Sequence, residues 1–567
     1  MSFSLLNKLP KIFFKNTKWL EKKQNTILSA AMIITVANLT SSISGLVRER
    51  LLISSYFNTE AGQMAYEALQ VAFQIPDMLF QLIILGALSA AFIPVFTKYR
   101  KKDELEAYKI TSSVMNILLL FFILVSIIVF VYSNQITAFR TGGEFTADQI
   151  KIAANLTRIM LLAQLFFAIS NFMTGILQSY QRFIVPAIAP ILYNIGIVLG
   201  VFLFGDFLGI YAAGVGVLMG AFSHMLIQLP FASRLGYQYQ FTILHKHPGV
   251  KEIFQMIPPR VMTVGVSEIQ NLALGFFATS IGSLSFVIIR LALKLMAIPI
   301  RLFGVPISQA SLPFLSQESD DTKRDQFKNL VTQSLNQITF LSMPAAALLL
   351  ILRIPIVRLV FGAENFPWRT TVLTSKVLAI IALSIGFQAM TQLLMRAFYS
   401  LKDTMTPLYI ILSSALLYFL VGWLSVFVFD VGVTGIAWAI LSAAIFESFI
   451  FMFMLERRIK HIFNNKNFYI SQIKMILCSF LMAVFLYLPY KIFDELVFDT
   501  SRTVEVIGLT VTTSTIGVLV YLYFSLLFEV KELEYFLRVF STFGKWRKTL
   551  GESEEVLIDL GSDGDEI

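Results

Sequence analysis

The chain has 567 residues, of which 56% are hydrophobic, 14% aromatic and only 14% charged. Soluble domains carry about 25% charged residues and could not bury this much apolar surface, so the composition excludes a soluble protein. The formal net charge of +9 does not by itself indicate nucleic-acid binding, because in a membrane protein the placement of Lys and Arg reports topology. With a single cysteine, Cys478, and four histidines, we expect no disulfide framework, no metal site and no cofactor.

The N-terminal segment, residues 1–26, is cationic and amphipathic. Its lysines are spaced so that they fall on one helical face, with Phe, Leu and Trp nearby: Lys8, Lys11, Lys15, Lys18 and Lys22. This pattern is typical of an interfacial helix, so we expect it to bind anionic membrane lipids and not nucleic acid.

Fourteen apolar runs are long enough to cross a bilayer core, which needs about 20 residues per helix. The sequence therefore predicts an all-α polytopic membrane protein with fourteen transmembrane helices. Basic segments such as KYRKK (98–102) share the side of the N-terminus, so we expect both termini in the cytoplasm. The predicted helices cover 27–57, 66–96, 108–133, 150–180, 186–205, 209–233, 253–280, 284–316, 327–361, 370–399, 407–429, 433–456, 470–490 and 503–529.

An internal repeat organises these helices. FQIPDMLF in the second run is echoed by MAIPIRLF in the eighth, with Pro76 and Pro299 separated by 223 residues. The junctions around Pro186 and Pro407, 221 residues apart, are also similar. We therefore predict two parallel six-helix repeats around a central cavity, an N-lobe (27–235) and a C-lobe (236–460). Helices 13 and 14 follow in 461–535, and a cytoplasmic tail, acidic and disordered at its end, fills 536–567.

Charged side chains inside the helices are the candidate site, because a charge in hydrocarbon is unfavourable unless it faces a cavity or a partner. The eighth helix carries Arg290, Lys294 and Arg301, whose spacings of 4 and 7 predict one cationic face. Such a face between two lobes favours an anionic substrate, for which phosphate or diphosphate is well suited.

Other charges leave more than one interpretation open. Arg48 and Glu49 lie in GLVRERLL of the first helix, and Glu67 and Asp77 in and near the second. Structural ion pairs or snorkelling side chains would explain some of these groups equally well, Arg50 included. The acid of the twelfth helix, Glu447, is either a cation or proton site for coupling or a helix contact.

Several segments, in order along the chain, resemble the MurJ/MviN family of lipid II flippases. They are SGLVRE (44–49), EALQVAFQIPD (67–77), GALSAAFIPVF (86–96), GILQSYQRFIVPAIAPILYN (175–194), FGVPISQASLPFLS (303–316), MPAAALLLILRIPIVRLVFG (343–362) and RAFYSLKDTMTP (396–407). The resemblance implies a fold of the multidrug/oligosaccharidyl-lipid/polysaccharide exporter superfamily. It also implies transfer of an undecaprenyl-diphosphate-linked precursor between leaflets for peptidoglycan synthesis, with a groove for the prenyl tail on helices 13 and 14.

By the same resemblance, Arg48 matches a family arginine and Glu49 the acid beside it. Glu67 stands where the family has Asp, and Lys294 where it usually has Arg. The charge at Lys294 is kept, but the bidentate fork of a guanidinium is lost.

Four positions depart from the family pattern. Arginines are expected where Ser42 and Phe80 stand, an acid where Leu293 stands, and often Asp or Asn where Leu274 stands. We expect Arg290 and Arg301 to replace part of the lost positive charge. The substitutions leave open how diphosphate is held and whether the cargo is standard lipid II.

The sequence thus predicts an alternating-access lipid flippase of the bacterial cytoplasmic membrane, a transporter and not an enzyme. Diphosphate would bind Arg48 and Lys294, supported by Arg290 and Arg301, with Glu49, Glu67 and Asp77 at the same site. The expected partners are the lipid-linked peptidoglycan precursor, anionic lipids and the cell-wall synthesis machinery, and we expect a monomer. The alternatives are a flippase for another polyprenyl-diphosphate glycan, a cation-coupled exporter, a membrane enzyme acting on lipid-linked sugars, and a transport-inactive cell-wall scaffold.

Overall fold

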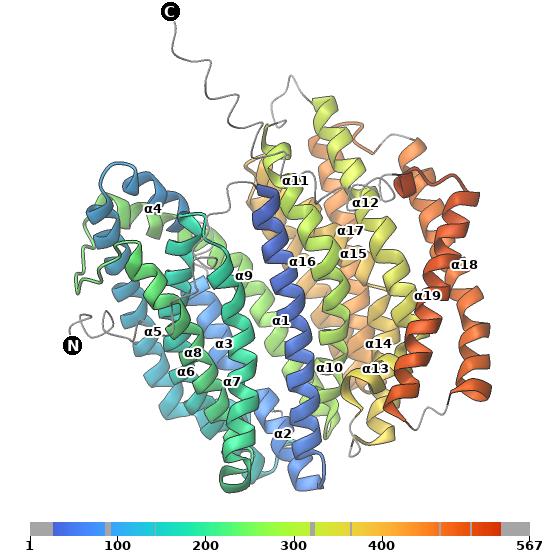
Figure 1. Cartoon of the computed structure of the whole chain (residues 1–567), viewed down its shortest axis with the longest axis horizontal. Coiled ribbons are helices and arrows are strands. Elements are labelled where there is room, and N and C mark those ends of the chain that lie inside the picture. Colours follow the sequence, from blue (N-terminus) through green and yellow to red (C-terminus); the bar gives the residue numbers. More distant parts are fainter. Residues whose placement is uncertain are drawn as a thin grey trace, which may run out of the picture.

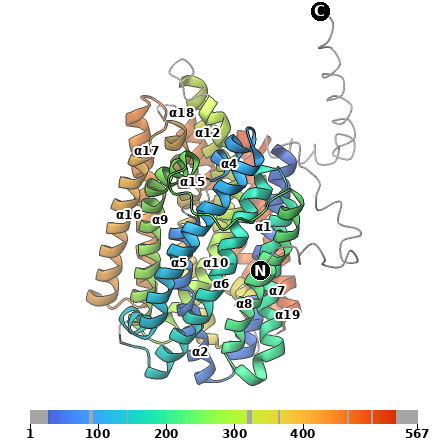
Figure 2. The same cartoon turned by 90° about the vertical axis from the view of Figure 1, so that its left-hand side faces the viewer.

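The computed structural model describes residues 27–85, 92–141, 143–317, 324–362, 366–463, 466–498 and 502–534. Every regular element in these ranges is a helix (Figure 1). The predicted N-terminal interfacial helix and the acidic tail lie outside the described residues. Figures 1 and 2 place α4 near one end of the helix bundle and α2 at the other, and we call these the α4 end and the α2 end.

Following the predicted repeat, we call residues 27–235 the N-lobe and residues 236–460 the C-lobe. The described part of the N-lobe contains eight α-helices and one π-helical segment. These are α1 (Ile27–Tyr56), α2 (Glu60–Ala72), α3 (Gln74–Phe80), η3 (Gln81–Leu85), α4 (Ile93–Arg100), α5 (Glu104–Arg140), α6 (Ala147–Ser179), α7 (Ile184–Leu208) and α8 (Tyr211–Arg234).

The C-lobe and the two helices after it contain the remaining elements. These are α9 (Pro248–Ile281), α10 (Ser285–Pro299), η5 (Ile300–Gly304), α11 (Val305–Gln317), α12 (Arg324–Ile351), α13 (Arg353–Phe361), α14 (Trp368–Ala382), α15 (Ile385–Ser400), α16 (Met405–Trp423), η7 (Leu424–Val428), α17 (Val433–Arg458), α18 (Lys466–Ile492), η8 (Phe493–Val497) and α19 (Thr503–Leu527). The pair α18 and α19 packs on α12 and α13 at the edge of the C-lobe (Figure 1).

The predicted all-α membrane fold is confirmed. Within the described ranges, nine helices are long and apolar enough to cross a membrane, or ten if α14 and α15, bent by 45° at their junction, form one span. Several of the fourteen predicted runs are broken helices, and 66–96 is divided among α2, α3, η3 and α4. The count of fourteen spans therefore stays a prediction.

The internal repeat has a matching backbone geometry. Pro186 and Pro407 are both the third residue of their helices, α7 and α16. The turns before these helices contain Gln181 and Lys402, 221 residues apart, and both have a φ of 59°. The π-helical segments η3 and η5 likewise follow Pro76 and Pro299. Equivalent breaks therefore shape equivalent helices in the two lobes.

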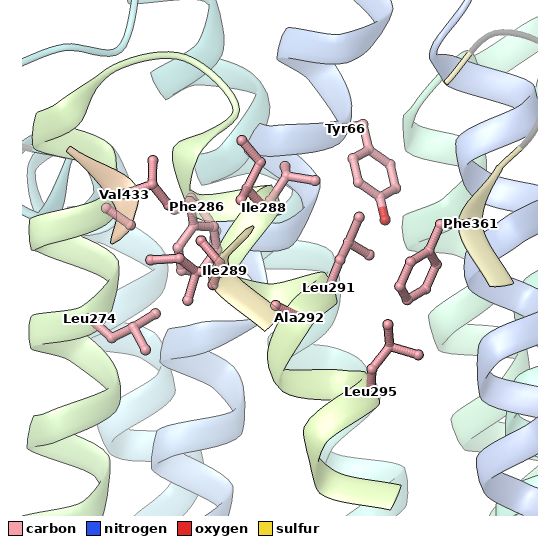
Figure 3. Packing of buried hydrophobic residues seen from close by; sticks show 14 of the residues in the cluster. Tyr66, Leu274, Phe286, Ile288, Ile289, Leu291, Ala292, Leu295, Phe361 and Val433 are labelled. Carbon is pink, nitrogen blue, oxygen red and sulfur yellow. The ribbon is translucent and has the colours of Figure 1, made fainter. Parts of the chain in front are cut away.

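The hydrophobic core consists of one large cluster shared between the lobes toward the α2 end and two smaller clusters toward the α4 end. One buried cluster combines Phe57 and Tyr66 of the N-lobe with Phe286 and Phe361 of the C-lobe. Figure 3 shows α10 in the middle of this cluster, with Tyr66 and Phe361 on one side and Leu274 and Val433 on the other. A second cluster lies in the N-lobe and the start of α9, and a third lies in the C-lobe. The lobes are therefore packed together near α2.

Glycines allow α7 and α8 to pack in direct backbone contact. A Cβ atom on Gly200 would lie 2.3 Å from the Cα of Gly216, and one on Gly196 would lie 2.4 Å from the Cα of Gly220. Small residues spaced by four along two membrane helices favour such a close approach. The tight α7–α8 pair supports the face of α7 that carries Tyr193 and Asn194.

We predict that Gly200→Ala destabilises the protein, because α7 and α8 must separate to admit the methyl group, at a cost of about 1–3 kcal/mol. Gly205→Ala is the matched control on the same helix, since nothing lies within 4 Å of its added Cβ. Thermal unfolding of the detergent-purified protein measures both variants. Equal melting temperatures for the two variants would contradict the close-packing account.

Candidate functional site

A cavity of about 200 Å³ lies between the lobes, where α1, α2, α3, α7, α8 and α10 meet. The predicted residues Arg48, Glu49, Asp77, Arg290 and Lys294 line it. The structure therefore brings together five of the seven proposed substrate-binding residues. Its other lining residues include the polar side chains of Gln70 and Tyr193.

The carboxylate of Glu49 is the centre of this site. It is fully buried, and its Oε2 forms ion pairs with Lys294 Nζ at 2.7 Å and with Arg48 Nη2 at 3.2 Å. Its Oε1 accepts hydrogen bonds from Tyr66 Oη and, at 2.7 Å, from Gln70 Nε2. A buried carboxylate is stable only with such partners, so Glu49 fixes the positions of four side chains at once.

Arg48 is oriented by α7 as well as by Glu49. Its Nη1 donates to Asn194 Oδ1 at 3.0 Å. Asn194 Nδ2 in turn donates to Ser44 Oγ at 2.8 Å and to the carbonyl of Ser41 at 3.2 Å. The guanidinium is therefore positioned before any ligand binds.

The bridge between Glu49 and Lys294 connects the two lobes, because Glu49 is on α1 and Lys294 on α10. Of the charged groups that line the cavity, Arg48, Arg290 and Lys294 exceed Glu49 and Asp77 by one positive charge. The site is therefore less cationic than the sequence pattern alone predicts, and two of its three cations already share a counter-ion.

Arg290 and Asp77 occupy another part of the cavity wall. Gln164 Nε2 donates to Asp77 Oδ1 at 2.8 Å. Among the described residues, Arg290 forms neither an ion pair nor a hydrogen bond, and its buried Nε has no acceptor. Its guanidinium lies 5.9 Å from the ring centroid of Phe286. Arg290 is thus the cavity cation available to an anion without displacing a carboxylate.

Two predicted site residues do not line this cavity. Arg301 is exposed, lies in the π-helical segment η5, about 10 Å along the helix axis from Lys294, and does not line this cavity, so its part in the site stays a prediction. Glu67 is buried beside the N-terminus of α10, near the backbone of Leu284 and Phe286 but without full hydrogen-bond geometry.

The α2 end holds further contacts between the lobes. Arg50 on α1 donates to the carbonyl of Leu359, near the C-terminus of α13. The rings of Phe57 and Phe366 lie 5.4 Å apart. An acid at the N-terminus of α10 and a cation at the C-terminus of α13 both match the helix dipoles. Arg50 therefore stabilises the packed lobes at this end, and Glu67 lies buried beside the start of α10.

A second cavity of about 270 Å³ lies within the C-lobe. Glu447 lines it and accepts a hydrogen bond from Ser414 Oγ at 3.0 Å. Much of the rest of the lining is uncharged and polar: Gln270, Asn271, Gln388, Thr391, Gln392, Ser414 and Tyr418.

Comparison with known proteins identifies the family. Residues 53–506 match the family model described as lipid II flippase MurJ. The chain belongs to this family. A protein of Thermotoga maritima named "Probable lipid II flippase MurJ" is 28% identical over 518 residues, which are 90% of this chain and 98% of the relative. A "Lipid II flippase MurJ" of Burkholderia cenocepacia is 25% identical over 441 residues, 76% of this chain and 84% of that one.

Solved structures agree on the fold. A structure titled "Lipid II flippase MurJ, inward closed conformation" has a TM-score of 0.70 at 24% identity and covers 88% of this chain and 98% of its own. A multidrug resistance MATE family transporter in an inward-facing conformation has a TM-score of 0.61 at 14% identity. The match covers 77% of this chain and 98% of that chain. The predicted MurJ family membership is confirmed.

The departures from the family pattern lie in different places. Leu274 and Leu293 line the second cavity, while the ring of Phe80 packs 6.1 Å from that of Phe167. None of the three lines the cavity between the lobes.

The sequence reasoning missed Tyr66, Gln70 and Asn194. Tyr66 comes directly before the motif EALQ, and Gln70 is its last residue. Asn194 is the last residue of GILQSYQRFIVPAIAPILYN, so all three lie in or beside motifs that resemble the family.

We predict that Glu49 and Lys294 are energetically coupled across the lobes. Glu49→Gln removes the counter-ion of Lys294 and Arg48, and Lys294→Gln removes the shorter of the two ion pairs of Glu49. Each change costs about 3–5 kcal/mol, and the double variant costs less than the sum. Thermal unfolding of the four proteins measures this cycle. The matched control is the exposed pair Lys491 and Glu495, 3.1 Å apart, for which we expect no coupling. If the stability losses of the Glu49 and Lys294 single variants simply add in the double variant, the two side chains are not coupled and the prediction is wrong.

Proposed function

We propose that this protein moves lipid II, an undecaprenyl-diphosphate-linked peptidoglycan precursor, from the inner to the outer leaflet of the bacterial cytoplasmic membrane. The observation that carries the proposal is the cavity between the lobes, with Arg48, Arg290 and Lys294 on its wall. Guanidinium and ammonium groups suit a diphosphate, and family membership supports a polyprenyl-linked precursor. The protein is a transporter and not an enzyme.

The diphosphate competes with Glu49 for Arg48 and Lys294. In the unliganded protein the Glu49 bridge holds α10 of the C-lobe to α1 of the N-lobe. A bound diphosphate brings its own negative charge to both cations, so the bridge is no longer needed to neutralise them. Substrate binding thereby weakens the contact between the lobes at the site itself, which couples it to alternating access.

The α4 end faces the cytoplasm in this proposal. KYRKK (98–102) is at the C-terminus of α4, and basic residues favour the cytoplasmic side. The lobes share one core at the α2 end, whereas at the α4 end most of the C-lobe has a core of its own and α9 packs on the N-lobe, which supports loading from the inner leaflet. Glu67 and Arg50 stabilise the outer closure, and opening there releases the cargo.

Other elements have supporting roles. The helices α18 and α19 bind the prenyl tail, and the N-terminal lysines bind anionic lipids. Membrane potential or an ion biases the lobe motion, since charged groups moving in the membrane field respond to it. Glu447, in the polar cavity of the C-lobe, serves this coupling and not the binding of cargo.

Lys294→Ala should abolish transport, and Lys294→Arg should retain it because the charge remains. Losing one charge-assisted bond weakens diphosphate binding by roughly tenfold to a hundredfold. Lipid II binding by native mass spectrometry and complementation of a flippase-depleted bacterium measure the two effects. Lys376→Ala, an exposed lysine of α14, is the matched control. If Lys294→Ala binds and flips like the parent protein, diphosphate is held elsewhere.

Glu447→Gln should leave lipid II binding near the parent value and change the dependence of transport on ions or voltage. The reason is that Glu447 lies in a different cavity from Arg48 and Lys294. Flipping in proteoliposomes, assayed with varied sodium, proton gradient and potential, measures the response. An unchanged ion and voltage response would assign Glu447 to the helix contact with Ser414.

A further inference from the structure

The segment between α8 and α9, residues 236–247, contains no helix and lies along α5 toward the α4 end (Figure 1). We call it the linker strap. It begins and ends against α5, because Tyr108 Oη donates to the carbonyl of Leu235 at 2.7 Å and His247 Nε2 lies 3.0 Å from Glu106 Oε1. The covalent connection between the lobes is therefore held on the N-lobe until α9 begins.

Polar side chains of α5 bind the backbone of the linker strap. Ser113 Oγ accepts a hydrogen bond from the amide of Leu244 at 2.7 Å. Asn116 Nδ2 donates to the carbonyls of Gln240 and Thr242, at 3.2 and 3.0 Å. Non-helical backbone is tolerated at membrane depth only where protein groups satisfy it, and these bonds meet that requirement.

Asn116 marks the level that the linker strap reaches on α5. Leu120, Ile123 and Ile127 follow it by four, seven and eleven residues, so they share its face of the helix, and all three are exposed. Because α5 has 37 residues and is about 55 Å long, whereas a bilayer core is about 30 Å thick, only part of it lies in lipid. The exposed apolar face identifies that part, and the linker strap lies directly at its edge.

Two large apolar side chains of the linker strap are exposed. Phe241 is 78% exposed and Ile243 is 46% exposed, and they alternate with residues whose backbone is bonded to α5. Two exposed lysines follow, Lys246 in the strap and Lys251 in the first turn of α9. Large apolar side chains beside basic ones are typical of a segment that lies in the bilayer interface.

We propose that the linker strap, positioned by Asn116, is a membrane anchor whose Phe241 and Ile243 insert into the bilayer leaflet at the α4 end. Its partner is phospholipid and not a protein, because these side chains continue the lipid-facing side of α5 and the lysines beside them suit anionic headgroups. The anchor fixes the level of α5 and of the start of α9 in the membrane. In the orientation proposed above this leaflet is the inner one, but the anchor depends neither on the cargo nor on the direction of transport.

Spin labels on the full chain, in vesicles of phosphatidylethanolamine and phosphatidylglycerol, test the anchor. Cys478→Ser removes the single cysteine, and Phe241→Cys then places one label on the linker strap. This label should collide often with oxygen, which dissolves among acyl chains, and rarely with a water-soluble nickel chelate. Ile127→Cys on the lipid-facing side of α5 and Lys101→Cys in the turn before α5 are the controls for lipid and for water.

Asn116→Leu tests whether α5 positions the anchor. The change removes the donor to two carbonyls of the linker strap, so the label at position 241 should become more mobile and lose its protection from the nickel chelate. Asn134→Leu, at an exposed asparagine of the same helix, is the matched control and should change neither property.

Three results would overturn the inference. The label at position 241 could collide freely with the nickel chelate, which would place Phe241 in water. It could be shielded from both reagents, which would mean that a protein surface covers it. The Asn116→Leu variant could also keep the collision rates and mobility of its parent. None of these measurements involves lipid II, so failure of the anchor leaves the proposed function standing.

Discussion

The burial of one carboxylate, Glu49, determines how the two lobes meet. Because the carboxylate is buried, its charge requires several donors, and these come from three helices: Arg48 on α1, Tyr66 and Gln70 on α2, and Lys294 on α10. Only Lys294 comes from the C-lobe, so this bond alone makes the charge balance of the site depend on the distance between the lobes. A ligand that supplies negative charge changes that balance directly.

The packing around Glu49 differs between the two ends of the molecule. Toward the α2 end the lobes share a core that includes Phe57, Phe286 and Phe361. Toward the α4 end the C-lobe has a core of its own, while α9 and the segment before it pack into the core of the N-lobe, and Lys98 of α4 pairs with Glu252 of α9 at 2.9 Å. We expect the loss of the Glu49 bridge to loosen the contact between the lobes most at the α2 end. There the remaining charged groups at the contact are Arg50, at the C-terminus of α13, and Glu67, at the N-terminus of α10.

Much of this site could be predicted from the sequence. A charge inside an apolar run needs a partner or a cavity, and that rule identified Arg48, Glu49, Arg290 and Lys294. The repeat, read from paired prolines, agrees with the matching turns at Gln181 and Lys402.

The sequence did not show how far along the helix the site extends: Arg301, about 10 Å along the axis from Lys294 and beyond Pro299, does not line the cavity. The sequence also could not show that Glu49 occupies two of the cations, or that Asn194 of α7 orients Arg48. These are contacts between distant segments, and no local pattern encodes them.

The central claim is that ligand and Glu49 compete for Lys294 and so control the separation of the lobes. That separation can be measured as the distance between two spin labels. One label is placed on exposed Ala61 of α2 and the other on exposed Val431 of the C-lobe. We predict that undecaprenyl diphosphate adds a second, longer distance to the label–label distribution of the parent protein. Glu49→Gln should populate the same longer distance without ligand. A distribution unchanged by both the ligand and the substitution would contradict it.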